Sequence, residues 1–158
     1  MKQFNLNNNI LKLKVKKSPL GIRIVMFFFA FVFFVFPLLG AIINIISGGG
    51  MQFGYFIGIG LFSVMGFYLL RVALWNTYGE ETIEFFENKI TYEANYGWFK
   101  DGKKEMSFAI LKYSFKLVGY EEDNEGVLVI ASEESLIESV VKMPINQVEE
   151  LISILQSL

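Results

Sequence analysis

The sequence of 158 residues contains no cysteine and no histidine. Without cysteine, the chain cannot form a disulfide, a thiolate metal site or a cysteine nucleophile. Without histidine, it lacks the commonest general base and the commonest metal ligand. Both absences argue against an enzyme.

Two segments approach known ligand-binding motifs without matching them. Glycines 48–50 are not followed by the Lys-Ser or Lys-Thr pair of a phosphate-binding loop. The acidic segment at residues 121–126 (EEDNEG) departs from the spacing of a calcium loop, which favours a solvated turn. No pair of carboxylates stands out from the other acids. We therefore predict a non-catalytic protein with no cofactor and no bound metal.

Charge is also missing from one long stretch, because residues 24–70 include no Asp, Glu, Lys or Arg. Hydrophobic residues make up 53% of the chain, and a soluble domain of this size would struggle to bury them. The stretch divides into apolar segments at 24–46 and 53–75, each about 34 Å long as a helix and so able to cross a hydrocarbon core of about 30 Å. The glycine-rich link at 47–52 predicts a transmembrane helical hairpin.

The charges outside the hairpin are segregated. Six basic residues and no acid precede the first span, whereas all 16 acids follow Trp75. Because basic residues near span ends stay in the cytoplasm, we expect a multi-pass protein of the cytoplasmic (inner) membrane with both termini cytoplasmic. A cleaved signal peptide ending at Ala41 is the weaker alternative, since the apolar run is longer than a usual signal and Leu39 stands where a small residue is required.

The second span carries glycines at multiples of four residues: Gly54, Gly58 and Gly66. Small residues on one helix face allow a second helix to approach closely. That helix is either the first span or a helix of another copy in a homo-oligomer, and we favour packing within the hairpin.

After Trp75 the pattern changes to short segments of strand length. We expect strands near residues 81–87, 90–95, 103–110, 112–120, 127–131 and 136–142, with turns at 88–89, Asp101-Gly102 and 121–126. An apolar stripe at helical spacing predicts a closing helix over 145–155, with Asn146 and Glu149 as a capping box. In residues 10–16 apolar side chains alternate with lysines, which predicts a strand that joins the same sheet.

Short antiparallel strands followed by one amphipathic helix resemble a pleckstrin-homology-like (PH-like) domain. With the strand at 10–16, the hairpin, ETIEFFENKITYEAN and PINQVEELISIL, the chain resembles the YcxB-like and related bacterial PH-like membrane proteins. The resemblance implies an α+β membrane protein made of a transmembrane hairpin and a PH-like antiparallel β-domain with a C-terminal helix. Its parts would be an N-terminal strand segment (1–20), the hairpin (21–76) and a cytoplasmic PH-like domain (77–158).

Two functions remain open. The first is a membrane-anchored, non-catalytic binding or scaffolding module at the cytoplasmic face, with the lipid bilayer and a membrane or cytoplasmic protein as partners and no nucleic acid. Anionic lipid head groups would then meet the basic residues Lys12, Lys14, Lys16, Lys17 and Arg23. We favour the simpler interpretation that these charges set topology and keep an edge strand soluble. The second function is a small transport or channel subunit formed by oligomerised hairpins, with the glycine face as its seam.

Overall fold

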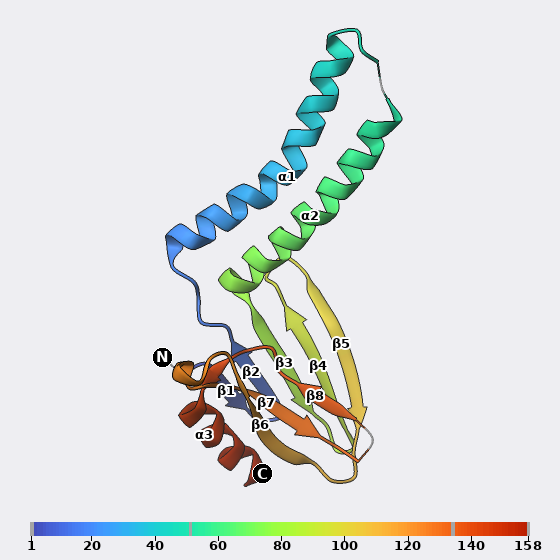
Figure 1. Ribbon diagram of the computed structural model, residues 1–158. Helices are drawn as coiled ribbons and strands as arrows, with labels where there is room; N and C mark the ends of the chain where they lie inside the picture. The colour runs from blue at the N-terminus through green and yellow to red at the C-terminus, as the bar shows by residue number, and fades with distance from the viewer. Residues whose placement is uncertain (1, 51, 134, 158) are drawn as a thin grey trace. The chain divides into compact units, whose positions relative to one another are not determined.

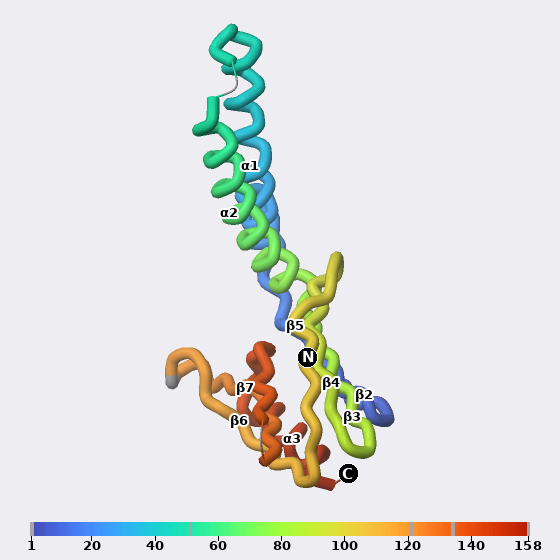
Figure 2. The backbone as a smooth tube through the Cα atoms, turned by 90° about the vertical axis from the view of Figure 1, so that its right-hand side faces the viewer, coloured from blue at the N-terminus to red at the C-terminus, as the bar shows by residue number. Residues whose placement is uncertain are grey.

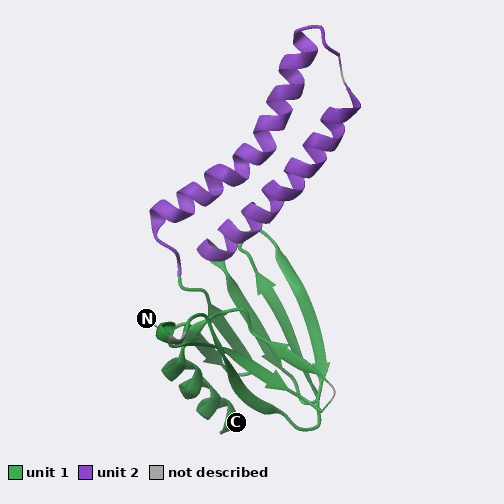
Figure 3. Ribbon diagram, in the orientation of Figure 1, with its two compact units in different colours: residues 1–16, 78–158 green, residues 17–77 purple. Residues whose placement is uncertain are grey.

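The computed structural model describes residues 2–50, 52–133 and 135–157 (Figure 1). The backbone separates into two compact units (Figure 3). The hairpin unit comprises residues 17–77, and the β-unit combines residues 1–16 with residues 78–158. Two segments that are distant in sequence therefore fold together in the β-unit.

The hairpin unit contains two long helices, α1 (Leu20–Ile46) and α2 (Phe53–Tyr78), except for the last residue of α2, Tyr78, which belongs to the β-unit. They exceed the predicted spans by four residues at the start of α1 and by three at the end of α2. Both are long and apolar enough to cross a membrane. In their most apolar stretches only 11% and 17% of the residues are buried, so most of their apolar side chains face outward.

Glycine conformations reverse the chain between the helices. Gly48 and Gly50 have φ values of +81° and +68°, in the left-handed region that side chains disfavour. The Asn44 side chain holds the reversal, because its Nδ2 donates a 2.8 Å hydrogen bond to the Gly50 carbonyl. Met51, which belongs to the expected link, lies outside the described residues.

Sheet A of the β-unit is antiparallel and has the order β1-β2-β3-β4-β5 (Figures 1 and 2). Its strands are β1 (Phe4–Asn7), β2 (Ile10–Lys14), β3 (Glu80–Phe85), β4 (Lys89–Asn95) and β5 (Lys100–Ser107). The strand expected at residues 10–16 is present as β2 and pairs with β3, placing Leu11 opposite Ile83. The prediction missed β1, which forms a hairpin with β2.

The predicted turn at Asp101-Gly102 is wrong, since both residues lie inside β5. The chain turns earlier, where the Tyr96 N–H donates to the Phe99 carbonyl and Gly97 adopts a φ of +88°. The β4–β5 ladder shifts register between Tyr92 and Ala94. Cross-strand pairing therefore outweighed the local preference of Asp-Gly for a turn.

Sheet B contains β6 (Lys112–Val118), β7 (Glu125–Ala131), β8 (Leu136–Glu138) and β9 (Met143–Pro144). β7 pairs with β6 and β8, and also with β9. The strand expected over 136–142 ends at Glu138, because the next backbone groups bond elsewhere. The Ser139 N–H still donates to the Leu128 carbonyl of β7, but the Leu128 N–H donates to the Ser139 hydroxyl, and the N–H groups of Val140 and Val141 donate to the Glu81 carboxylate.

The closing helix α3 (Ile145–Gln156) packs on β6, β7 and β9, and it buries Val148, Leu151 and Leu155. The expected capping box is wrong. The helix begins after Pro144, and this N-cap residue makes no side-chain capping bond. Asn146 lies inside the helix and accepts a bond from Gln147 N–H.

The core of the β-unit draws apolar side chains from both sheets and from α3. Fully buried members include Leu11, Leu13, Ile83, Ile90, Leu128, Ile130 and Leu151. Gln3 connects the N-terminal segment to α3 and to the residue before β9. Its backbone N–H donates to the Gln147 side chain, and its Nε2 donates to the Lys142 carbonyl. The chain is thus α+β, with two long apolar helices, antiparallel sheets and a C-terminal helix.

Candidate functional site

The basic residues singled out in the sequence do not form one cluster of free charges. Lys12 and Lys14 point from β2 to the same carboxylate on β3, with Nζ atoms 3.2 and 3.4 Å from the oxygens of Glu80. The Glu80 side chain is only 17% exposed, so it lies beneath the two lysines. Their charges are partly neutralised within sheet A.

The remaining basic residues precede or begin α1. Lys16 and Lys17 are exposed, and the structure gives them no ion pair within its described residues. Arg23 is half-buried, and its Nε is buried without a hydrogen-bond partner in the described part of the chain. Lys16 and Lys17 are therefore the exposed charges of the predicted basic set that remain for an external anion.

The three glycines of the second span have different surroundings. A Cβ at Gly66 would come within 3.0 Å of the Phe34 ring and 3.2 Å of the Ala30 carbonyl, so α1 packs closely there. A Cβ built on Gly54 or Gly58 would have no described atom within 4 Å apart from its chain neighbours and the nearby backbone of α2. Twelve residues rotate a helix by about 120° beyond whole turns, so Gly66 does not share a face with Gly54. Of these three glycines, only Gly66 lies at the contact between α1 and α2.

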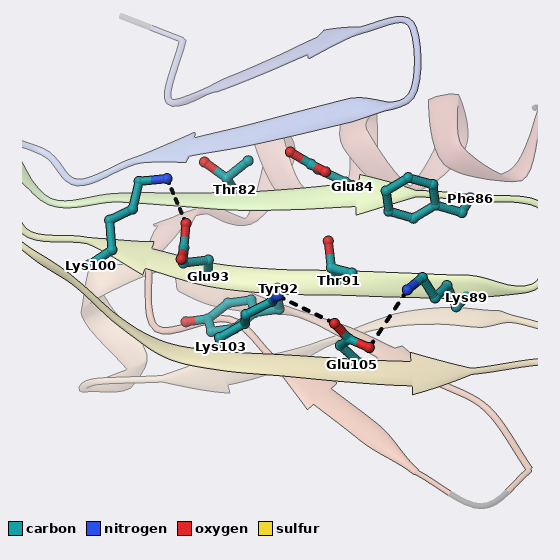
Figure 4. A pocket seen from close by; sticks show the side chains of 10 residues that line it. All are labelled: Thr82, Glu84, Phe86, Lys89, Thr91, Tyr92, Glu93, Lys100, Lys103 and Glu105. Carbon is teal, nitrogen blue, oxygen red and sulfur yellow. Dashed lines mark hydrogen bonds and ion pairs between the residues drawn. The ribbon is translucent and has the colours of Figure 1, made fainter.

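The outer face of sheet A has a shallow hollow of about 340 Å³ (Figure 4). Two ion pairs between β4 and β5 and one within β5 surround it. Lys100 lies 2.7 Å from Glu93, and Glu105 lies 3.4 Å from Lys103 and 3.6 Å from Lys89. The hydrogen bond from Lys103 lowers the pKa of Glu105, and the one to Glu93 raises the pKa of Lys100.

Two of the three described carboxylates that line this hollow are already paired with lysines. The third, Glu84, has Thr82 and Thr91 among the neighbouring lining residues. Among the described residues there is no group of three or more acidic, histidine or cysteine side chains that could hold a metal ion. The outer face of sheet A thus carries surface ion pairs, each of which contributes little to the stability of the fold.

The most unusual side chain of the β-unit is Glu81, which is fully buried on β3. Its Oε1 accepts hydrogen bonds from Tyr92 Oη at 2.7 Å and from Val140 N–H at 2.6 Å, and its Oε2 accepts from Val141 N–H at 3.4 Å. The carboxylate thus joins sheet A to the segment between β8 and β9. Sequence reasoning missed it, although Glu81 has the same strand parity as Ile83 and therefore faces the core.

Burial controls the titration of this pair. Loss of water raises the pKa of Glu81, while the hydrogen bonds from Tyr92, Val140 and Val141 act in the opposite direction. Burial, followed by the charge of Glu81, raises the pKa of the Tyr92 hydroxyl, which stays protonated as a donor. Three donors satisfy the carboxylate, so its geometry indicates a structural clasp between the sheets rather than a reactive acid.

The edges of the two sheets differ in length and character. β1 has four residues and β8 has three, and short edges offer little to a pairing strand. β5 has eight residues, but five of them are charged, including Lys100, Lys103 and Glu105. β6 is a seven-residue edge that pairs, among the described strands, with β7 alone.

β6 (KYSFKLV) exposes apolar side chains along that edge. Phe115 is 36% exposed and Leu117 is 66% exposed, on the same strand face as the half-buried Tyr113. Lys112 and Lys116 occupy the opposite face, where Lys116 lies 3.0 Å from Glu138. Unpaired backbone groups beside exposed apolar side chains can template a further strand.

No family model, no curated protein and no solved structure matches the chain.

Proposed function

We propose that this chain is a membrane-anchored, non-catalytic scaffolding module whose β-unit associates through the open edge of β6. The hairpin unit would supply the anchor and the β-unit the binding surface. The observation that carries the proposal is the long β6 edge with Phe115 and Leu117 exposed.

The exposure of the two helices supports membrane insertion. A core helix of a soluble protein buries most of its apolar side chains, whereas α1 and α2 bury few of theirs. Helices of 27 and 26 residues are about 40 and 39 Å long, which covers a hydrocarbon core of about 30 Å and reaches the head groups. In this arrangement the basic residues before α1 would hold both termini in the cytoplasm.

A PH-like interpretation of the β-unit is part of this proposal. Two antiparallel sheets and a closing helix packed on the second sheet support it. In such an arrangement the domain is interrupted after β2 by the hairpin and resumes at β3. The interruption ties the sheet to the bilayer at two points of the chain and would limit how far the β-unit can move from the membrane.

The occupant we propose for the β6 edge is the β6 strand of a second copy. When two antiparallel copies are centred on Phe115, Tyr113 faces Leu117, and Ser114 faces Lys116. This register places the two Phe115 side chains together, and it sets no two like charges opposite each other. A register centred on Ser114 would set Lys112 against Lys116, which is unfavourable.

Cysteine cross-linking tests this pairing without background, because the natural chain has no cysteine. Antiparallel partners have Cα atoms about 4.5–5.5 Å apart, within the range that a disulfide bridges. Phe115→Cys in native membranes should form a disulfide-linked dimer on mild oxidation. Lys103→Cys, an exposed position on the charged β5 edge, is the matched control and should stay monomeric.

The result also reports the register. Ser114→Cys should cross-link less than Phe115→Cys, since the Phe115-centred pairing separates the two Ser114 residues. Equal cross-linking at Phe115 and Lys103 would show random collision and overturn the proposal. Stronger cross-linking at Ser114 would overturn the register while keeping the β6 interface.

A lipid contact at the basic segment is a smaller part of the proposal. Lys16 and Lys17 would meet anionic head groups at about 1 kcal/mol each. Lys12 and Lys14 would add less, because they share Glu80. Arg23, which lies within α1, would remain a topology signal.

A channel subunit is the second candidate, and the uncovered Gly54 and Gly58 favour it. These glycines would let hairpins of different copies approach closely. Conductance of the purified protein in planar bilayers tests this function, and a pore should disappear in a Gly58→Leu variant. A scaffold predicts no conductance in either form.

A further inference from the structure

The turn between β4 and β5 carries three aromatic residues in four positions, and we call residues 96–99 (Tyr-Gly-Trp-Phe) the aromatic turn. Two of its rings stabilise the turn itself. Tyr96 and Phe99 stack with centroids 4.9 Å apart and planes 13° from parallel, and the Asn95 side chain accepts the Gly97 N–H at 2.8 Å. The third ring, Trp98, is 61% exposed.

The aromatic turn lies against Tyr78. A Cβ built on Gly97 would stand 2.7 Å from the Cβ of Tyr78, so only glycine permits this approach, and its φ of +88° also requires glycine. Tyr78 is the last residue of α2 and is itself 51% exposed. Both residues belong to the β-unit, so the contact is internal to it.

Chain continuity then places the turn relative to a bilayer. If α2 crosses the membrane, its 26 residues extend about 39 Å, which exceeds the hydrocarbon core by several ångström at each end. Tyr78 would therefore lie in the head-group layer, and a turn packed on Tyr78 would lie there too. Tryptophan and tyrosine prefer this layer because their rings are apolar and their N–H or O–H groups need polar partners.

We propose that the aromatic turn is a lipid-contacting anchor that inserts Trp98 into the interfacial layer beside the end of α2. The inference rests on the membrane anchorage proposed above and adds a site in the β-unit that touches lipid. The occupant is the bilayer surface, since the turn packs on Tyr78, the last residue of the helix that would leave the membrane there. This contact would hold sheet A at the membrane and restrict rotation of the β-unit about the α2 connection.

Tryptophan fluorescence tests the site, because the chain has only Trp75 and Trp98. The Trp75→Phe variant leaves Trp98 as the single reporter, and Trp98→Phe leaves Trp75. Each full-length variant is reconstituted into phosphatidylcholine vesicles with and without lipids brominated near the head-group end of the acyl chain. Circular dichroism and protease resistance verify that both variants fold like the parent.

We expect brominated lipid to remove most of the Trp98 emission and the vesicles to shift that emission to shorter wavelength. Quenching of Trp75 without quenching of Trp98 would overturn the aromatic-turn anchor and leave the membrane hairpin intact. Absence of quenching at both residues would overturn the membrane anchorage itself, and the anchor with it. Strong quenching of Trp98 by aqueous acrylamide, with red emission, would likewise reject the insertion.

Discussion

The hydroxyl of Tyr92 on β4 donates a 2.7 Å hydrogen bond to the Glu81 carboxylate on β3, and both side chains are buried between the sheets. Ile83 faces Tyr92 directly in the ladder, so Glu81 and Tyr92 meet on the diagonal. The same carboxylate accepts the Val140 and Val141 N–H groups. One acidic side chain thus links two strands of sheet A to the segment between β8 and β9.

This clasp predicts a specific pH dependence of stability. Burial raises the pKa of Glu81 above its ordinary value of 4.5, so the folded state holds this proton more tightly than the unfolded chain does. The associated stabilisation is fully present below about pH 4.5 and is lost as the pH rises through the folded-state pKa, by up to about 1.4 kcal/mol per pH unit. Urea unfolding of the detergent-solubilised protein across this range measures the loss.

The Glu81→Gln variant should lack that component of the pH dependence, because its side chain does not titrate. Glu80→Gln is the matched control, since the neighbouring carboxylate faces the outer surface and leaves Glu81 intact. The clasp would be contradicted if Glu81→Gln and the parent chain showed the same dependence of unfolding free energy on pH.

The orientation of the hairpin is open to a direct test. The basic residues before α1 predict that the link between the helices faces outward and that the β-unit faces the cytoplasm. Ser47→Cys, at the end of α1, should react with an impermeant thiol reagent in intact cells. Glu122→Cys, an exposed position in the β-unit, should react only after the cells are opened. The reverse pattern would invert the topology.

The N-terminal strand should be required for the stability of the β-unit. Leu13 is fully buried on β2, and an unpaired carboxylate there should cost several kcal/mol. We expect Leu13→Asp to make residues 78–158 sensitive to limited proteolysis. Lys12→Ala, the adjacent outward position, should leave the cleavage rate nearly unchanged. Equal resistance of Leu13→Asp and the parent would mean that β2 is dispensable.

The docking of α3 gives a further stability prediction. Leu151 is fully buried against sheet B, and its truncation to alanine should cost about 2–5 kcal/mol. Small domains have about 5–15 kcal/mol in total, so Leu151→Ala should lower the urea midpoint and the yield of folded protein. Glu149→Ala, on the exposed face of the same helix, serves as the control. Unchanged stability of Leu151→Ala would mean that the helix contributes no packing.

Periodicity predicted much of the architecture. The uncharged stretch predicted both long helices, alternation predicted β2 and β4, and the apolar stripe predicted α3. The YcxB-like resemblance, the lipid contacts and the orientation stay predictions. These successes have a common reason: hydrophobic periodicity is a local property that the amino acids themselves carry.

The failures arise where a local signal competed with a partner on another strand. Asp101-Gly102 resembles a turn, yet pairing with β4 carried the strand through it. Residues 139–142 read as a strand, yet the buried Glu81 carboxylate captured the N–H groups of Val140 and Val141. Glu81 lies far from Val140 in sequence, and the pairing of β5 with β4 is not encoded in the Asp101-Gly102 dipeptide, so neither local pattern revealed the competing partner.

The sequence by itself determined the two apolar helices, their antiparallel connection and the alternation that puts Leu11 and Leu13 on one face. Only the tertiary structure decided that Glu81 is buried, that β6 is an open edge and that Gly97 packs against Tyr78. The difference has a physical cause. Helix formation and strand alternation depend on neighbours a few residues away, whereas burial and edge position depend on which strands pair across long stretches of chain.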